Sequence, residues 1–427
     1  MYIAILGRQP AISVAELERL YGADSVAWLS DESAKVSNEN FDFERLGGSR
    51  KAGRIITEFP GLKWPFLSEK IATHYQETWQ NLDHKITLGI SCYGFDVKPR
   101  DILKLGLSLK KIATKSGGSL RLIPNADPAL STATSHHNKL GLSPNKIELL
   151  LVKASNGRII LAESVGTQNI TALAARDQAR PKTDAFVGML PPKLARMMVN
   201  MATGASSSSL QPSHSEGSAF PAEVGTRRIA TSGPTVPEQG DGHDELRGTV
   251  LDPFCGTGVV LQEASLLGYK AYGTDLSEKM VDYSRANLEW LKQRYRYISV
   301  PRLELGDATK HAWQPPINAI ASESYLGQPF SAPPAPEKLA AVRDNCDHII
   351  SAFLKNIASQ LKPGTPLCLA IPAWRDTLGN FTHLPLIDNL SKLGYQRIEL
   401  EHARADQLLY YRENQVVARE LLILSRV

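Results

Sequence analysis

Cysteine is scarce in this sequence. Its 427 residues include four cysteines, and no two of them form a Cys-x-x-Cys pair. That excludes a disulfide framework and a zinc knuckle, so we expect reduced thiols and no bound metal. Long hydrophobic runs are also missing. Nothing approaches the ~20 apolar residues of a membrane span, and the opening run of residues 1–6 is shorter than a secretory signal. These absences favour a soluble, cytoplasmic protein without a membrane partner.

A large surplus of one charge is missing as well. The whole chain carries 48 Lys and Arg against 44 Asp and Glu, a net charge of +4. The surplus is uneven, because residues 61–200 hold 19 basic and 10 acidic residues while both flanks are slightly acidic. An anionic partner such as nucleic acid would therefore bind the middle of the chain. The 42% of hydrophobic residues excludes a wholly disordered protein, and the length predicts two or three domains.

The first sixty residues predict a small α+β domain. Residues 2–6 are typical of a strand, and Ser13-x-x-Glu16 predicts a capping box at the start of a helix that Gly22 ends. Two short apolar runs, at 26–29 and 54–59, predict further strands.

A second α+β domain is expected over residues 61–170. The pattern predicts helices over 69–80 and 99–115 and strands over 85–93 and 119–123. Two later apolar runs joined by Asn156-Gly157 predict a β-hairpin. The helix over 99–115 is basic, and such a helix is by itself more often a solvated face than a binding surface. Its lysines are Lys104, Lys110, Lys111 and Lys115.

The rest of the chain, from residue 171, predicts an α/β domain. Residues 190–201 form an amphipathic pattern whose methionine stripe is typical of core packing, and the composition of 204–248 predicts a disordered insertion. Alternating strands and helices then indicate a doubly wound, mostly parallel sheet. The expected strands are 249–252, 270–274, 317–321, 366–371, 395–402 and 416–424.

The first of these strands runs into the loop Asp252-Pro-Phe-Cys-Gly-Thr-Gly258. Its glycines let a ligand approach the backbone, and the following helix offers free N–H groups. No lysine follows, which excludes a P-loop, and the third glycine of a dinucleotide site is missing. Asp252 would repel a pyrophosphate. It suits a ligand with ammonium and sulfonium charges, such as S-adenosylmethionine.

Two further strands end in acidic residues. Asp275 could accept hydrogen bonds from ribose hydroxyls, and Asp307 could hold an adenine amino group. Each of them alone would more often be a turn or a helix cap. Together with Asp252, they predict one cofactor site at the carboxyl edge of the sheet.

These residues resemble a known family. The loop with Asp275 and Gly306-Asp307 resembles the class I S-adenosylmethionine-dependent methyltransferases, in the branch that methylates exocyclic amino groups of bases. The segments YIAILGRQPAIS, RDQARP, GMLPPKLARMMVN and ENQVVARELLIL resemble the tRNA guanosine N-2-methyltransferases that carry a THUMP domain.

The resemblance implies a domain order. A ferredoxin-like α+β domain would span 1–60, a THUMP RNA-binding domain 61–170, and a Rossmann-like class I methyltransferase domain 171–427. The cofactor S-adenosyl-L-methionine would be bound by a set of residues from the strand ends and the glycine loop, namely Asp252, Phe254, Gly256, Thr257, Gly258, Asp275 and Asp307.

The resemblance also implies a substrate. It is tRNA, methylated on the 2-amino group of a guanosine near position ten, by direct transfer without a covalent nucleophile. The four lysines of the basic helix and Arg121 would then contact RNA phosphates. Some members of the family also need a small activating protein subunit as a partner.

One motif departs from the family pattern. Where the family has Asp-Pro-Pro-Tyr or Asn-Pro-Pro-Phe, this chain has Ser322-Glu323-Ser324-Tyr325. Tyr325 would stack on the extruded base. Ser322 occupies the acidic or amide position, and Glu323 supplies the carboxylate if the loop is shifted by one residue. Two alternatives stay open: an amino-methyltransferase on ribosomal RNA or DNA, and a catalytically inactive RNA-binding homologue.

Overall fold

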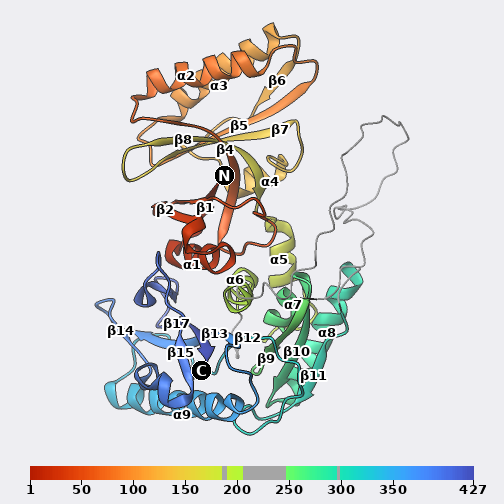
Figure 1. Cartoon of the computed structure of the whole chain (residues 1–427), viewed down its shortest axis with the longest axis vertical. Coiled ribbons are helices and arrows are strands. Elements are labelled where there is room, and N and C mark those ends of the chain that lie inside the picture. Colours follow the sequence, from red (N-terminus) through yellow and green to blue (C-terminus); the bar gives the residue numbers. More distant parts are fainter. Residues whose placement is uncertain (185–189, 205–246, 296–298) are drawn as a thin grey trace.

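The computed structural model describes residues 1–184, 190–204, 247–295 and 299–427. The molecule is long, with one sheet at each end and the helices α5 (Ile170–Gln178) and α6 (Pro192–Thr203) between them (Figure 1). The disordered insertion predicted at 204–248 lies, apart from its ends, outside the described residues. Among the residues described, no helix is long and apolar enough to cross a membrane.

The N-terminal sheet has eight strands in the order β2-β3-β1-β4-β8-β7-β5-β6. They are β1 (Tyr2–Leu6), β2 (Val26–Ser30), β3 (Ser33–Val36), β4 (Ser49–Phe59), β5 (Lys85–Tyr93), β6 (Ser119–Leu122), β7 (Lys146–Lys153) and β8 (Ile159–Thr167). The central strand β4 pairs with β1 on one side and with β8 on the other. Residues on both sides of position 60 therefore share one sheet. The domain boundary at 60 stays a prediction.

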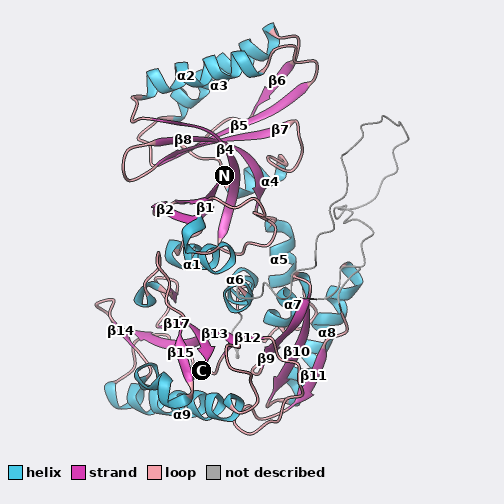
Figure 2. Ribbon diagram, in the orientation of Figure 1, coloured by secondary structure: helices cyan, strands magenta, loops and turns pink. Residues whose placement is uncertain are grey.

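Four helices pack on or beside this sheet, namely α1 (Pro10–Tyr21), α2 (Trp64–Thr78), α3 (Pro99–Lys115) and α4 (Thr132–His137). Helices α2 and α3 lie side by side at the outer end of the molecule (Figure 2). Their apolar stripes join β5 and β7 in one core. The predicted strand at 85–93, helix at 99–115 and hairpin through Asn156-Gly157 are confirmed, with Gly157 at the positive φ of +83° that such a turn requires.

The predicted capping box in α1 is wrong, although Gly22 does end this helix. The helix begins at Pro10, so Ser13 lies inside it and donates a hydrogen bond to the Gly48 carbonyl at 2.9 Å. The buried Glu16 carboxylate accepts the N–H groups of Gly47 and Gly48, each at 2.8 Å, and the Asn200 amide of α6 at 2.7 Å. These side chains therefore fasten α1 to a loop and to α6 instead of starting a helix.

The helix α6 lies between the two sheets and is buried almost throughout. As predicted, its stripe of large apolar residues is core. It packs against α1 on one side and against α7 (Val259–Leu266) and the C-terminal sheet on the other. The stripe consists of Leu194, Met197, Met198 and Met201.

The C-terminal sheet follows the order β11-β10-β9-β12-β13-β17-β15. Its strands are β9 (Arg247–Asp252), β10 (Tyr269–Asp275), β11 (Arg302–Leu305), β12 (Ala319–Glu323), β13 (Pro366–Arg375), β15 (Tyr395–Arg397) and β17 (Val417–Arg426), and the short β14 (Phe381–Thr382) and β16 (Leu409–Tyr410) pair outside this path. The first five strands are parallel, and β17 lies antiparallel between β13 and β15.

Helices cover both faces of this sheet. On one face α6 and α7 are joined by α8 (Glu278–Arg294), and on the other lies the long α9 (Pro336–Ala358). The predicted doubly wound, mostly parallel sheet is confirmed. The chain runs outward from β9 to β11 and resumes on the other side with β12, which places the switch of direction between β9 and β12. A crevice opens beyond the carboxyl ends of strands at such a switch.

Candidate active site

The glycine loop follows β9 directly and turns into α7. Gly256 and Gly258 have φ of +50° and +82°, conformations that other residues adopt only with strain. A Cβ on Gly258 would also stand 2.9 Å from the Ser284 hydroxyl oxygen of α8. The Ser284 hydroxyl in turn donates a hydrogen bond to the Gly256 carbonyl at 2.8 Å, and this bond fastens the backbone of the loop to α8.

Asp275, at the end of β10, lies against this loop. One carboxylate oxygen accepts the N–H of Gly256 at 2.9 Å, and the other accepts the N–H of Ser277 at 2.9 Å. Burial raises the pKa of Asp275 above its ordinary value. The structure thus brings together two of the residues that the sequence assigned to one site, although they are 19 positions apart.

Asp252, at the end of β9, is almost fully buried at 2% exposure. Its Oδ1 accepts the Ser322 hydroxyl at 2.6 Å and the Phe254 N–H at 3.2 Å. Burial raises the pKa of this carboxyl to about 7 in spite of both hydrogen bonds, and the negative charges of Asp275 and Glu323 add to the effect. A ligand cation beside Asp252 would favour its ionised form.

Asp307 lies at the same sheet edge, because the Gly306 N–H donates to the Asp275 carbonyl at 2.9 Å. Its own carboxylate closes a local turn. It accepts the hydroxyl and the N–H of Thr309 at 2.7 and 3.0 Å, and these bonds lower the pKa of Asp307. Among the described residues, the Asp307 carboxylate shares no hydrogen-bond donor with the carboxylates of Asp252 and Asp275.

The altered fourth motif lies at the end of β12, and the structure separates the two residues proposed for its acidic position. Ser322 has no exposed surface and uses its hydroxyl on Asp252. Glu323 is partly exposed, and its Oε1 accepts a short hydrogen bond from Arg419 Nε of β17. Among the described residues, Arg419 alone is hydrogen-bonded to this carboxylate. Glu323 is therefore the more accessible of the two side chains.

Tyr325 follows two residues later and is 42% exposed. Its ring lines a hollow of about 300 Å³ between the loop and α9, together with polar side chains such as Gln328, Lys338 and Asn345. An exposed ring beside amide groups can stack on a planar ligand and bind its edge.

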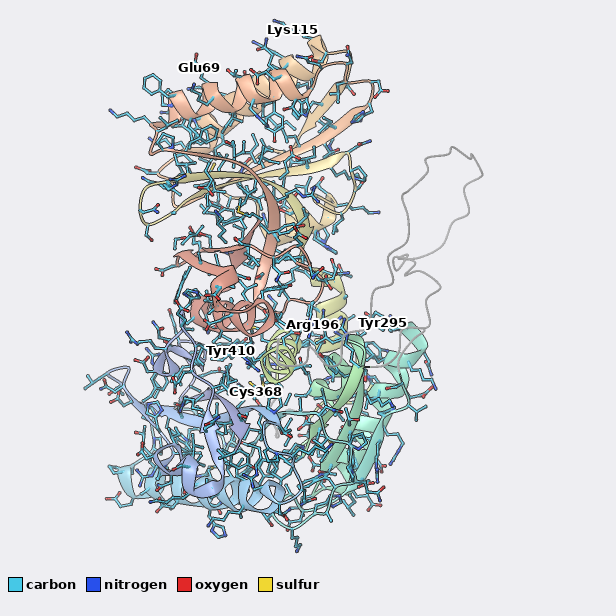
Figure 3. The ribbon with its side chains drawn as sticks, in the orientation of Figure 1. Glu69, Lys115, Arg196, Tyr295, Cys368 and Tyr410 are labelled. Atoms are coloured by element: carbon cyan, nitrogen blue, oxygen red, sulfur yellow. The ribbon has the colours of Figure 1, made fainter. Side chains whose placement is uncertain are left out.

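The predicted RNA contacts lie elsewhere. The four lysines of α3 are exposed, because the buried side of α3 is formed by Ile102, Leu105 and Leu109. Arg121 of β6 is exposed as well. Lys115 lies at the outer tip of the molecule, far from Cys368 in the C-terminal sheet (Figure 3). The basic helix and the glycine loop are therefore two separate surfaces.

Sequence reasoning missed a buried ion cluster next to the site. The Glu263 carboxylate of α7 accepts hydrogen bonds from Arg176 Nε of α5 at 2.5 Å and from Arg196 Nε of α6 at 2.7 Å. Burial acts to raise the pKa of Glu263, but the two arginines hold it below its ordinary value. Arg196 lies between the two sheets (Figure 3). The segments RDQARP and GMLPPKLARMMVN carry Arg176 and Arg196, but neither indicates their common partner.

The four cysteines are free thiols, and all of them are buried. Within the described ranges, no group of three or more His, Cys, Asp or Glu side chains could hold a metal ion.

Known proteins align with part of the chain. The tRNA (guanine(10)-N2)-dimethyltransferase of Methanothermobacter thermautotrophicus is 28% identical over 202 residues, which is 47% of this chain and 44% of the relative. The enzyme of that name from Pyrococcus abyssi is 33% identical over 133 residues, 30% of this chain and 35% of the relative. Part of the chain is therefore similar to the tRNA (guanine(10)-N2)-dimethyltransferases. The family resemblance predicted from the sequence is confirmed, while the THUMP domain within it stays a prediction.

The match to these dimethyltransferases covers less than half of their length. No protein-family model matches the chain. Among solved structures, TrmN from Thermus thermophilus aligns with 100% of this chain and 99% of its own, at 13% identity and a TM-score of 0.47.

Proposed function

We propose that this protein transfers a methyl group from S-adenosyl-L-methionine to the exocyclic 2-amino group of a guanosine in tRNA. The observation that carries the proposal is the group of acids around the glycine loop, in which Asp275 bonds to Gly256 and Asp252 bonds to Ser322 of the fourth motif. The glycine loop and the fourth motif therefore meet at one edge of the sheet. The aligned dimethyltransferases support the choice of substrate.

The residues at this edge of the sheet fit this cofactor. Asp275 retains lone pairs that can accept hydrogen bonds from ribose hydroxyls, and the ionised form of Asp252 suits a neighbouring cation. Gly256 and Gly258 leave the loop without side chains where a ligand approaches. The bound cofactor would supply an electrophilic methyl group. Asp307, Phe254 and Thr257 complete the proposed set of contacts.

The substrate side needs a hydrogen-bond acceptor and a stacking platform. An amino group on an aromatic ring is a poor nucleophile, so the protein's task is to orient its lone pair and accept its proton as positive charge develops. Glu323, held by Arg419, would accept an N–H of the amine, and Tyr325 would stack on the extruded base. The chain needs no covalent nucleophile, and Cys255 of the loop is a buried packing residue.

Nucleoside analysis tests the proposal directly. Total tRNA is incubated with the purified chain and S-adenosylmethionine, and its nucleosides are measured by mass spectrometry. We expect N2-methylated guanosine, with no product from the Asp252→Ala variant. Ribosomal RNA and duplex DNA serve as alternative substrates, and methylated nucleosides in DNA alone would contradict the tRNA proposal. A lack of product on every RNA, with tRNA binding intact, would favour an RNA-binding homologue.

Cofactor affinity should depend on the protonation of Asp252. The free protein holds a proton on this carboxyl below about pH 7, and a cationic ligand must displace it. We therefore expect the affinity for S-adenosylmethionine to fall by up to about tenfold per pH unit as the pH drops below 7. Calorimetric titrations between pH 5.5 and 8 measure this.

Two variants complete that test. Asp252→Asn should bind the cofactor weakly with little change over this pH range. Asp307→Asn should keep the pH dependence, since hydrogen bonds to Thr309 hold the pKa of Asp307 low. Equal slopes for the wild type and Asp252→Asn would remove Asp252 from the cofactor site.

RNA binding should depend on the basic helix and act apart from chemistry. Changing Lys110 and Lys111 to glutamate should weaken tRNA binding and lower its salt slope by about 1 for each phosphate that the helix no longer neutralises. The rate at saturating tRNA should stay the same, because α3 lies far from the glycine loop. Filter binding at several salt concentrations measures the slope. Lys292→Glu on α8, also exposed, is the control, and an equal loss of affinity there would contradict a specific role for α3.

We expect the protein to act in the cytoplasm, where its four free cysteines would stay reduced. Assays with the purified chain alone also test whether an activating subunit is needed.

A further inference from the structure

Arg180, in the connector after α5, is buried without a partner. Its side chain is only 4% exposed, and Nε, Nη1 and Nη2 all lack a hydrogen bond. Four other arginines of the described residues have one buried unpaired nitrogen each, but only at Arg180 does the whole guanidinium lack partners. Burial lowers the pKa of Arg180, with Asp177 alone opposing it. A buried, unpaired cation is costly enough that an anionic ligand is the simplest reason for it.

The connector is tied to the glycine loop two residues after Arg180. Two residues later, the Lys182 backbone forms two hydrogen bonds with the side-chain amide of Asn287 in α8. The Lys182 N–H donates to the amide oxygen at 2.9 Å, and the amide nitrogen donates to the Lys182 carbonyl at 2.8 Å. The same amide donates to the Thr257 carbonyl in the glycine loop at 2.9 Å. Because two residues span at most about 7 Å, the backbone of Arg180 cannot leave the neighbourhood of this contact.

Two lysines near the loop, among the residues that the structure describes, are already engaged. Lys182 and Lys279 both lie over the ring of Tyr283, at 5.4 and 5.3 Å from its centroid, and Lys279 also pairs with Asp184 at 2.8 Å. The loop itself presents acids. Asp252 would bind the ammonium of the proposed cofactor and Asp275 its ribose hydroxyls, but neither acid can bind the cofactor's carboxylate. Arg180 is a buried cation that is free to bind this third group.

We propose that Arg180 binds the carboxylate of the methionine tail of S-adenosylmethionine. A guanidinium offers paired N–H donors that match the two oxygens of a carboxylate, which makes arginine better suited than lysine to this contact. The inference rests on the proposed function only in its choice of cofactor. It makes the connector between the N-terminal sheet and the catalytic domain part of the cofactor site.

Binding measurements on the whole chain test this without methyl transfer. S-adenosylhomocysteine and its decarboxylated analogue are titrated into the wild type and into Arg180→Gln by calorimetry. For the wild type, removal of the ligand's carboxylate should weaken binding about 10- to 100-fold, the range of a hydrogen bond to a charged group. Arg180→Gln should bind S-adenosylhomocysteine about as weakly as the wild type binds the decarboxylated analogue. For the decarboxylated analogue itself, the variant and the wild type should have the same affinity.

Further variants make the test specific. Arg180→Lys should recover part of the affinity, and Arg285→Gln, which removes an exposed arginine of α8 paired with Asp282, should change neither titration. If Arg180→Gln does not fold, the wild-type comparison of the two ligands still decides. Equal wild-type affinity for both ligands would overturn the inference alone, and no affinity for either would overturn the proposed cofactor with it. If Arg180→Gln binds both ligands normally but no longer binds tRNA, the anion is an RNA phosphate.

Discussion

Replacing Glu323 by alanine should lower the rate of methyl transfer at saturating tRNA and cofactor by about 10²- to 10³-fold, as expected when a site loses its main group for stabilising developing charge. The affinity for cofactor should change little, since Asp252, Asp275 and the glycine loop keep their contacts. Single-turnover rates together with cofactor titrations separate the two effects. Asp406→Ala, which breaks an exposed carboxylate–arginine pair with Arg404, is the matched control.

The same experiment decides the register of the fourth motif. Ser322→Ala should slow transfer by less than about tenfold, because the Ser322 hydroxyl is fully buried and directed at Asp252. Arg419→Met should slow transfer by releasing the Glu323 side chain, and combining it with Glu323→Ala should add little to the effect of Glu323→Ala alone. If Ser322→Ala abolishes transfer while Glu323→Ala leaves it intact, Ser322 occupies the acidic position.

Removing Glu263 should destabilise the protein more than removing any surface carboxylate. The change Glu263→Ala leaves Arg176 and Arg196 close together and without their common partner, and breaking a buried pair in this way costs about 3–5 kcal/mol. Urea unfolding followed by fluorescence and circular dichroism measures the decrease in the free energy of unfolding.

Glu58→Ala is the matched control for that change. Glu58 also pairs with two basic residues, Lys35 and Arg158, but at the surface, where such pairs contribute about 1 kcal/mol or less. If the two variants were destabilised equally, the Glu263 cluster would have no special structural role.

The sequence predicted the features that depend on local chemistry. Asn156-Gly157 determines a hairpin turn with its own two residues, and the strand ends at Asp252 and Asp275 follow from short apolar runs that stop at an acid. The candidate site could be predicted because parallel strands bring their carboxyl ends to one edge, whatever the length of the segments between them.

The features that it missed depend on contacts between distant segments. Arg419 reaches Glu323 only because β17 inserts antiparallel between β13 and β15, and no short-range pattern encodes that insertion. Ser13 and Glu16 had the spacing of a cap but bind residues 35 and 184 positions away. A capping box and a tertiary anchor use the same residue types, so the sequence could not separate them.

The strand β4 has a consequence for the order of synthesis. Its residues pair early with β1, which the ribosome has already released, but its other edge waits for β8, more than ninety residues later. Until then, an eleven-residue strand exposes its unpaired amides and carbonyls on one side. A nascent chain or fragment ending near residue 60 would carry this open edge and tend to self-associate. A fragment of the first 167 residues, which includes β8, should therefore be soluble, wherever the boundary between the two predicted N-terminal domains lies.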